Sequence, residues 1–399
     1  MARRLTLDFL KTESGAGLLL ALAAAAAVAW ANSPWADRYF ALVATPIAVR
    51  LGDFAQTRSL SGWVADGLMA IFFLVVGMEI KFEVLRGELS SPRRLALPVL
   101  AALGGMVVPA LVYMAVNLGP RGVPSGWPAA TATDIAFALA ALAIVAPRLP
   151  SALRVFLLTL AIADDVGAVA LIALLYTAKL DPAATAGVGL ALAALAALSR
   201  WRRAPFLFYA VGFVVVWGFT LQSGLNTSIA GIACAMTVPV GARRAGQDSV
   251  LKFFMDSLHP YVAYAILPLF AFTAAGFSLG GLGAREILSP VPLGLALALL
   301  IGKPVGVFGF SLAATATRVA RKPAGGTWLE LFGVSLVCGV GFTVSLFIGG
   351  LAFHGAGRLG QDQLRLGVIA GSLLATLTGA AVLARAQALR AARPEDPRQ

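Results

Sequence analysis

The sequence predicts an all-α, polytopic membrane protein, and two features lead to that class. Of its 399 residues 59% are hydrophobic and only 13% are charged, whereas soluble domains typically carry about 25% charged residues. The hydrophobic residues also occur in runs of about 20, the length that crosses the hydrocarbon core of a bilayer. So few charges cannot cover a water-soluble protein of this length, so the lipid bilayer is the expected environment.

We predict about twelve spanning helices. The first, Gly15–Ala31, is longer than the hydrophobic part of a secretory signal and lacks a convincing cleavage site, so it is counted as a span. Between the first two spans, the stretch from Ala41 to Leu60 contains Pro46 and a Gly52-Asp53 pair, which predicts a small β-hairpin rather than a helix. The polar tail 391–399 is predicted to be disordered. The predicted spans cover residues 15–31, 62–84, 95–118, 124–146, 151–177, 183–200, 205–221, 225–241, 252–277, 291–315, 328–352 and 364–386.

The basic residues behind the net charge of +12 lie in short clusters between the apolar runs, so this charge does not indicate a nucleic-acid partner. With these spans, 22 of the 31 Lys and Arg residues fall on one side of the membrane and 8 on the other. The positive-inside rule makes the first side cytoplasmic, so both termini are expected there and the hairpin on the opposite side. Cys234 and Cys338 lie in apolar stretches without metal-ligand spacing, and we expect inert packing residues.

Two of the predicted spans contain residues that interrupt a helix. The span 124–146 carries Pro128, Thr133 and Asp134, and the span 328–352 carries Gly339 and Gly341 near its middle. Such residues allow the backbone to unwind where protein or water can satisfy it. The third to fifth predicted spans correspond in order to the tenth to twelfth, each set having a broken helix in the middle. This predicts two repeats at about 95–177 and 291–386 within a single transmembrane domain of residues 1–390.

Asp164 and Asp165 are the strongest functional signal, because both lie near the middle of an apolar run. A carboxylate at the centre of a spanning helix costs about 2.5–3.5 kcal/mol on insertion scales. The alternative is a buried salt bridge with a second carboxylate at its rim. Sodium prefers oxygen ligands, and two carboxylates that share a site raise the pKa of one of them. Protons and sodium would then compete for the same oxygens, which is what obligatory exchange requires.

Three further residues are expected to support this site. Asp134 can compensate the positive end of a half-helix at the break, with the hydroxyl of Thr133 beside it; alternatively it is only an N-cap. Lys303 is a basic residue at the middle of a predicted span, far from either end, so it should pair with Asp164 or Asp165. It either holds two helices together or carries a proton.

Three other titratable residues lie nearer the helix ends. Glu79 and Glu83 sit one turn apart near the cytoplasmic end of the second span. They are either interfacial residues or a funnel that gathers cations and responds to pH. His259 precedes Pro260 in the ninth span; a lone histidine is more often satisfied locally, and the alternative is a part in the pH response.

The sequence resembles the NhaA family of bacterial sodium/proton antiporters over about residues 9–390. The motifs that carry the resemblance are FFLVVGMEIKFE, TATDIAFALA, IADDVGA, HPYVAYAILPLFAF and GKPVG. Paired broken helices mark the binding site in several transporter folds, and NhaA is one of these folds. The resemblance implies inverted repeats that cross near the membrane midplane and an electrogenic exchange of two protons for one sodium or lithium ion, serving sodium and pH homeostasis.

The resemblance also assigns roles to residues. It implies that Asp164 and Asp165 bind the ion and protons, that Asp134 lies at the helix break, and that Lys303 belongs to the site. Glu79 and Glu83 would form the cytoplasmic entrance. The protein would lie in the bacterial inner membrane, need no cofactor, and form a homodimer partly through the hairpin. The chain departs from the family pattern at Asn226, Met255 and Phe82, positions tied to pH response.

Three other classes compete with an antiporter. A cation channel also uses carboxylates, but the two broken helices favour alternating access. A sodium-coupled symporter would need a pocket for an organic substrate, and the broken segments offer no obvious cluster for one. An intramembrane aspartyl protease, which would be an enzyme, places its aspartates on two helices within a Gly-x-Gly-Asp signature that this chain lacks.

Overall fold

The structure is a computed structural model that describes residues 2–51, 54–87, 92–177, 180–201, 205–241, 249–280 and 282–391. It is mostly helical, and its contacts divide the chain into two units. The first contains Met1–Leu22, Ser91–Asp164 and Phe277–Gln399, and the second contains Ala23–Ser90 and Asp165–Gly276. Helices α1 (Ala2–Ala31) and α7 (Ser151–Leu175) each contribute to both units.

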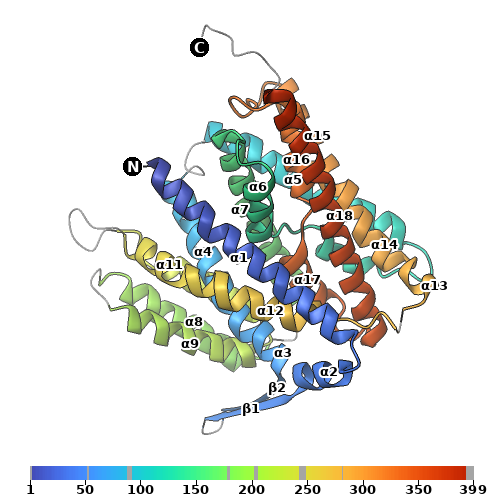
Figure 1. Cartoon of the computed structure of the whole chain (residues 1–399). Coiled ribbons are helices and arrows are strands. Elements are labelled where there is room, and N and C mark those ends of the chain that lie inside the picture. Colours follow the sequence, from blue (N-terminus) through green and yellow to red (C-terminus); the bar gives the residue numbers. More distant parts are fainter. Residues whose placement is uncertain are drawn as a thin grey trace. The chain divides into compact units, whose positions relative to one another are not determined.

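The first unit holds the two interrupted spans (Figure 1). Its helices before the α7 segment are α5, a 3-10 helix and α6, and those after it begin with the short α13 and end with the long α18. Their bounds are α5 Pro92–Asn117, the 3-10 helix Pro124–Ala130, α6 Ile135–Val145, α13 Ala284–Ile287, α14 Pro290–Leu297, α15 Lys303–Ala316, α16 Trp328–Val337, α17 Phe342–Ala352 and α18 Gly357–Ala391.

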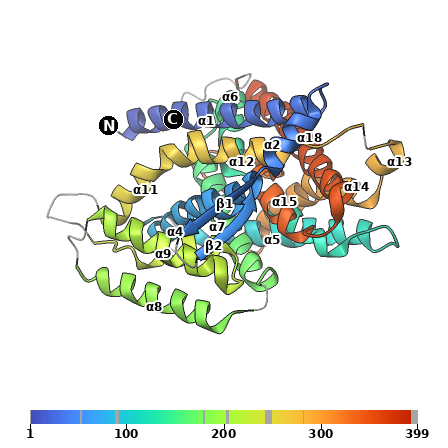
Figure 2. The same cartoon turned by 90° about the horizontal axis from the view of Figure 1, so that it is seen from below.

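The second unit is built around α4, and its peripheral pair α8 and α9 lie side by side (Figure 2). Helix α3 (Leu60–Trp63) continues into α4 through a π-helical turn at Val64–Leu68, and α11 continues into α12 through another at Val262–Ile266. The remaining bounds are α2 Ala36–Ala44, α4 Met69–Arg86, α8 Pro182–Leu198, α9 Phe206–Ser223, α10 Thr227–Thr237, α11 Val250–Tyr261 and α12 Leu267–Ala275.

Many of these helices are apolar and long enough to cross a membrane, as the composition predicts. Among the described residues six helices pass this test alone, and three bent pairs bring the number to nine if each pair is one span. Helices α8 and α10 are apolar but shorter. The membrane class is therefore confirmed, whereas the count of twelve spans stays a prediction.

The predicted hairpin is present as an antiparallel pair in the second unit. Strand β1 (Pro46–Leu51) pairs with β2 (Phe54–Ser59), with Leu51 opposite Phe54. Residues 41–44, which the sequence predicts to be part of the hairpin region, are instead the last turn of α2, and Leu60 begins α3; β structure runs only from Pro46 to Ser59. The predicted Gly52-Asp53 turn lies outside the described residues, as do residues 392–399 of the predicted tail.

Both predicted helix breaks are confirmed. The 3-10 helix Pro124–Ala130 and α6 meet at an angle of 47°, and α16 and α17 meet at 45°. The intervening residues 131–134 and 338–341 are buried, so their backbone groups must find partners in the protein. A π-helical turn at Ala298–Gly302 separates α14 from α15 and ends directly before Lys303, and such turns often occur at functional sites.

Helices α5 and α15 approach closely because two glycines face each other. A methyl group on Gly306 would come within 2.0 Å of the carbonyl oxygen of Gly104, so a side chain there would force the helices apart. Small residues commonly permit such close helix packing in membranes. This contact fixes the position of α15 and therefore of Lys303, its first residue.

Candidate functional site

The two helix breaks lie against each other in the first unit. The backbone N–H of Asp134 donates to the carbonyl oxygen of Val340 at 2.7 Å, and the hydroxyl of Thr133 donates to the carbonyl oxygen of Cys338 at 3.0 Å. Each break therefore satisfies polar groups of the other, which allows both to be buried in an apolar setting.

Asp134 is the N-cap of one half-helix and contacts the start of the other. One carboxylate oxygen accepts from the N–H of Phe137 at 3.0 Å, in α6. The other accepts from the N–H and hydroxyl of Thr343, at 3.0 and 2.5 Å, at the start of α17. Asp134 is thus the N-cap of α6, and the same carboxylate also faces the positive end of α17; whether it has a part in the ion path stays a prediction.

The start of α17 has a second partner in α18. The hydroxyl oxygen of Ser372 accepts from the N–H groups of Gly341 and Phe342, at 3.2 and 3.1 Å. With Asp134 it satisfies three consecutive N–H groups that a helix N-terminus would otherwise leave unpaired. Sequence reasoning missed both Thr343 and Ser372. A threonine just after the glycine break is a weak signal, whereas nothing in the sequence indicates Ser372.

Lys303 pairs with Asp164, as the sequence predicts for one of the two aspartates. The ammonium nitrogen Nζ lies 2.6 Å from Oδ2 of Asp164, and both side chains are fully buried. The same nitrogen donates to the carbonyl oxygen of Thr131. The single proton of the Thr133 hydroxyl is shared between this Oδ2, at 2.7 Å, and the carbonyl oxygen of Cys338, at 3.0 Å. Lys303, Asp164 and Thr133 therefore form one buried cluster at the break.

The other oxygen of Asp164 is available. Oδ1 is buried and has no hydrogen-bond partner among the described residues. A buried acceptor without a partner is costly, and a proton or a cation would satisfy it. No group of three or more His, Cys, Asp or Glu side chains in the described part of the chain could hold a metal ion, so a cation here would need carbonyl, hydroxyl or water oxygens as well.

The remaining predicted site residues belong to the second unit. Asp165 is buried and follows Asp164 directly in α7. Glu79 and Glu83 lie one turn apart on α4, and His259 lies near the end of α11. The structure thus brings together Thr133, Asp164 and Lys303, and it leaves the roles of Glu79, Glu83 and His259 as predictions.

Two residues that flank α10 are explained by capping. The amide oxygen of Asn226 accepts from the N–H of Ser228 at 3.0 Å at the start of the helix. At its end, Nζ of Lys81 donates to the carbonyl oxygens of Met236 and Val238, at 2.5 and 2.6 Å. Lys81 lies between Glu79 and Glu83, so α4 is bound to the C-terminal end of α10 at the position of the glutamates.

We expect Thr343→Val to destabilise the protein by about 1.5–3 kcal/mol. Valine has nearly the shape of threonine but lacks its hydroxyl, so Asp134 loses one hydrogen bond while the packing is kept. Thermal unfolding in detergent measures this. The control is Thr378→Val, which removes a hydroxyl that donates only to its own helix, at the exposed surface of α18. Equal stability of Thr343→Val and Thr378→Val would contradict the capping role.

The fold and the site define a polytopic membrane transporter with a buried lysine–aspartate pair beside two interrupted helices. The sequence profile of the Na+/H+ antiporter 1 family matches residues 7–383. The chain belongs to this family. It is therefore a transporter rather than an enzyme, and a multi-pass membrane protein.

Relatives in three bacteria cover nearly the whole chain. A protein of Pseudomonas savastanoi pv. phaseolicola named Na(+)/H(+) antiporter NhaA 2 is 47% identical over 94% of both chains. Na(+)/H(+) antiporter NhaA of Rhodospirillum rubrum is 47% identical over 94% of this chain and 96% of its own. Na(+)/H(+) antiporter NhaA 2 of Erythrobacter litoralis is 43% identical over 98% and 96%. The resemblance to the NhaA family is confirmed.

Proposed function

We propose that this protein exchanges sodium, or lithium, for protons by alternating access at Asp164 and Asp165, in a bacterial inner membrane. Membership of the antiporter family supports sodium/proton exchange as the activity. The observation that carries the assignment of the site is the buried Oδ1 of Asp164, which has no hydrogen-bond partner in the described part of the chain and lies beside the Lys303 ion pair.

Competition for the carboxylates would couple the two fluxes. A sodium ion at Asp164 takes the oxygen atoms that otherwise hold a proton or the ammonium of Lys303, so ion and proton exclude each other. Lys303 then either releases a proton when sodium arrives or acts only as a structural partner. The carboxylate of Asp134 compensates the positive ends of the two half-helices at the breaks, so that these ends do not repel a cation that approaches the site.

Several finer features belong to the same proposal. They are twelve spans in two inverted repeats, cytoplasmic termini, a homodimer joined partly through the hairpin β1–β2, and a cytoplasmic entrance at Glu79 and Glu83. Each follows from the sequence pattern or from the resemblance to the NhaA family. Labelling of single-cysteine variants from either side of the membrane can test the spans, the termini and the entrance, and cross-linking can test the dimer.

A flux experiment tests the activity and its stoichiometry. In sealed proteoliposomes, sodium and lithium should dissipate an imposed proton gradient and potassium should not. If two protons exchange for one sodium, each cycle moves one charge, and the membrane potential contributes about 2.3 kcal/mol per 100 mV. Sodium pulses should therefore give a current on a supported membrane. Exchange without current would refute the two-to-one stoichiometry, and potassium activity equal to sodium activity would refute the ion selectivity.

The pH dependence should be set mainly by the transport site. The family pattern has a histidine at the position of Asn226, and histidine has a reference pKa of about 6.5, whereas asparagine cannot titrate. The pattern has charged residues at the positions of Met255 and Phe82, which carry no charge. Protons occupy the site at low pH and become scarce at high pH, so activity against pH should form a broad bell. Its acid limb should move to lower pH as sodium rises. A pH profile at half-saturating and saturating sodium measures this, and an acid limb that stays fixed would indicate a regulatory site, with Glu79, Glu83 and His259 the first candidates.

A further inference from the structure

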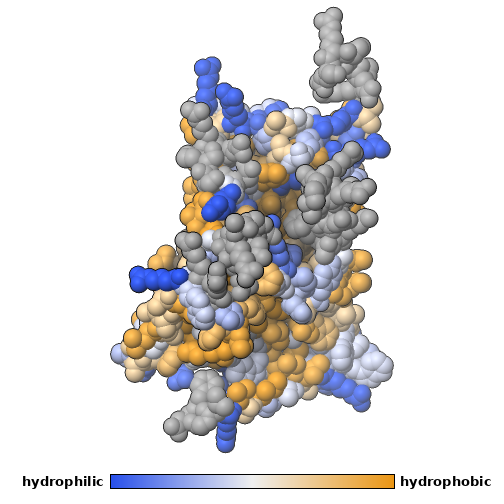
Figure 3. Space-filling view, turned by 90° about the vertical axis from the view of Figure 1, so that its left-hand side faces the viewer, coloured by the Kyte–Doolittle hydropathy of each residue, from blue (hydrophilic) through white to orange (hydrophobic). Residues whose placement is uncertain are grey.

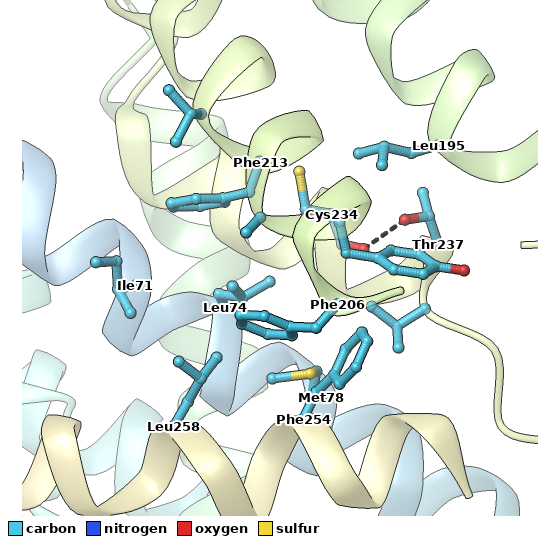
Figure 4. A pocket seen from close by; sticks show the side chains of 14 residues that line it. Ile71, Leu74, Met78, Leu195, Phe206, Phe213, Cys234, Thr237, Phe254 and Leu258 are labelled. Carbon is cyan, nitrogen blue, oxygen red and sulfur yellow. Dashed lines mark hydrogen bonds between the residues drawn. The ribbon is translucent and has the colours of Figure 1, made fainter. Parts of the chain in front are cut away.

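A cavity of about 240 Å³ lies in the second unit among α4, α8, α9, α10 and α11. Figure 4 shows Leu74, Met78, Phe206, Phe254 and Leu258 converging on it, with Cys234 nearby. Its lining is almost entirely apolar. The hydroxyl of Thr237, a polar group in the lining, already donates to the carbonyl oxygen of Cys234 at 2.7 Å (Figure 4). The hydroxyl of Tyr209, another lining residue, is buried without a hydrogen-bond partner among the described residues, but a single free hydroxyl is fewer than the polar partners that hold a buried water or an ion.

A void of this size and chemistry is suited to an apolar guest. A buried water needs two to four polar partners, and even apolar cavities of about 150 Å³ stay dry and bind small apolar molecules. An unfilled cavity also deprives the surrounding side chains of dispersion contacts. A guest that fits the walls of the cavity would restore those contacts.

The mouth of the cavity lies at a surface that faces lipid. Phe206 and Val214 line the cavity and are 40% and 57% exposed. They continue the exposed apolar stripe of α9 that includes Leu207 and Val211, on a helix long and apolar enough to span the membrane. The face seen in Figure 3, on the side of α8, α9 and α11, carries many hydrophobic side chains across its middle.

The inner wall, in contrast, is closed to the surrounding bilayer. Met78, Cys234 and Phe254 line the cavity and are at most 3% exposed. The cavity thus leads from a lipid-facing mouth to a buried wall between α4, α10 and α11. The molecules present in quantity at such a mouth are membrane lipids, and their unbranched chains are narrow and flexible.

We propose that this cavity binds an acyl chain of a membrane phospholipid. Lipid tails are as apolar as leucine, so transfer out of the bilayer supplies no hydrophobic driving force. The chain is held instead by contact with the walls of a void that would otherwise be empty. It would lie against Met78, next to Glu79 on α4, and this site is independent of the proposed ion-exchange function.

Photolabelling in the bilayer tests the proposal. The full chain is reconstituted in vesicles of phosphatidylethanolamine and phosphatidylglycerol that contain a trace of phosphatidylethanolamine with a diazirine near the end of one acyl chain. We expect adducts on Met78 and Cys234 as well as on the exposed stripe of α9. Labelling confined to the exposed stripe would overturn the proposal, because lipid around the protein explains that labelling alone.

Two variants and one control make the test specific. Ala210→Leu adds volume inside the cavity, and Val214→Trp covers its mouth from the lipid side, so each should lower wall labelling by about tenfold by occupying or closing the space. The control, Gly189→Leu, places the same leucine side chain as Ala210→Leu at an exposed position on α8 where a side chain would meet nothing, and it should leave wall labelling unchanged. If Ala210→Leu fails to insert, Val214→Trp alone decides. Unchanged wall labelling in an inserted variant would overturn the proposal.

Discussion

Asp164→Asn and Asp165→Asn should each reduce sodium/proton exchange to the level of protein-free vesicles while the protein still inserts. An amide cannot ionise, and its oxygen holds sodium less well than a carboxylate does. In Asp164→Asn the amide oxygen can still accept hydrogen bonds from Lys303 and Thr133, which bind Oδ2 in the parent protein. The fold should therefore survive, and proteoliposome proton flux driven by sodium measures the loss.

Glu330→Gln is the matched control for this prediction. Glu330 is also buried, at 1% exposure, and also forms an ion pair, with Arg390 at 3.1 Å. It lies at the first turn of α16, where it completes a capping box with Thr327, and not in the cluster around Asp164. Exchange should persist in Glu330→Gln once insertion is matched. Substantial exchange in either aspartate variant would refute the site.

Lys303→Ala should lower the free energy of unfolding by about 3–5 kcal/mol, the loss found when one partner of a buried ion pair is removed. The ammonium contacts Asp164 and the carbonyl oxygen of Thr131 in a fully buried setting, so water cannot replace it. Thermal unfolding of the protein in detergent measures the change. Lys322→Ala is the control, because the ammonium of Lys322 lies 5.3 Å from the ring centre of Trp328, in a cation–π contact worth about 0.5–1 kcal/mol at an exposed site.

The current carried by the Lys303→Ala variant distinguishes its two roles. If Lys303 carries a proton, the variant should exchange sodium for protons without net charge movement. If Lys303 is structural, the residual exchange should still produce a current. A stability equal to that of the parent would contradict both roles, since each requires the buried pair.

Much of the architecture could be predicted because it follows from local composition. Apolar runs of the length of a bilayer locate the helices, and Pro128, Gly339 and Gly341 mark the two breaks, which the structure places at residues 131–134 and 338–341. Pro46 marked the start of β1, whereas residues 41–44 extended α2 because nothing in their side chains prevents a helix. The number of spans was less well determined, since α8 and α10 are too short to be recognised by length alone.

The residues alone predict a membrane protein with two broken helices and with charges inside its apolar runs, because a charged residue in an apolar run is conspicuous without any knowledge of its neighbours. Which charges meet follows from the packing of the helices. Lys303 could pair with either aspartate, and the close approach of α5 and α15 at Gly104 and Gly306 sets α15 in the position where its ammonium reaches Asp164. The capping of α17 by Asp134 and Ser372 likewise depends on residues 209 and 30 positions away in sequence from the groups they bind. No local pattern encodes such contacts, because they arise from helix packing.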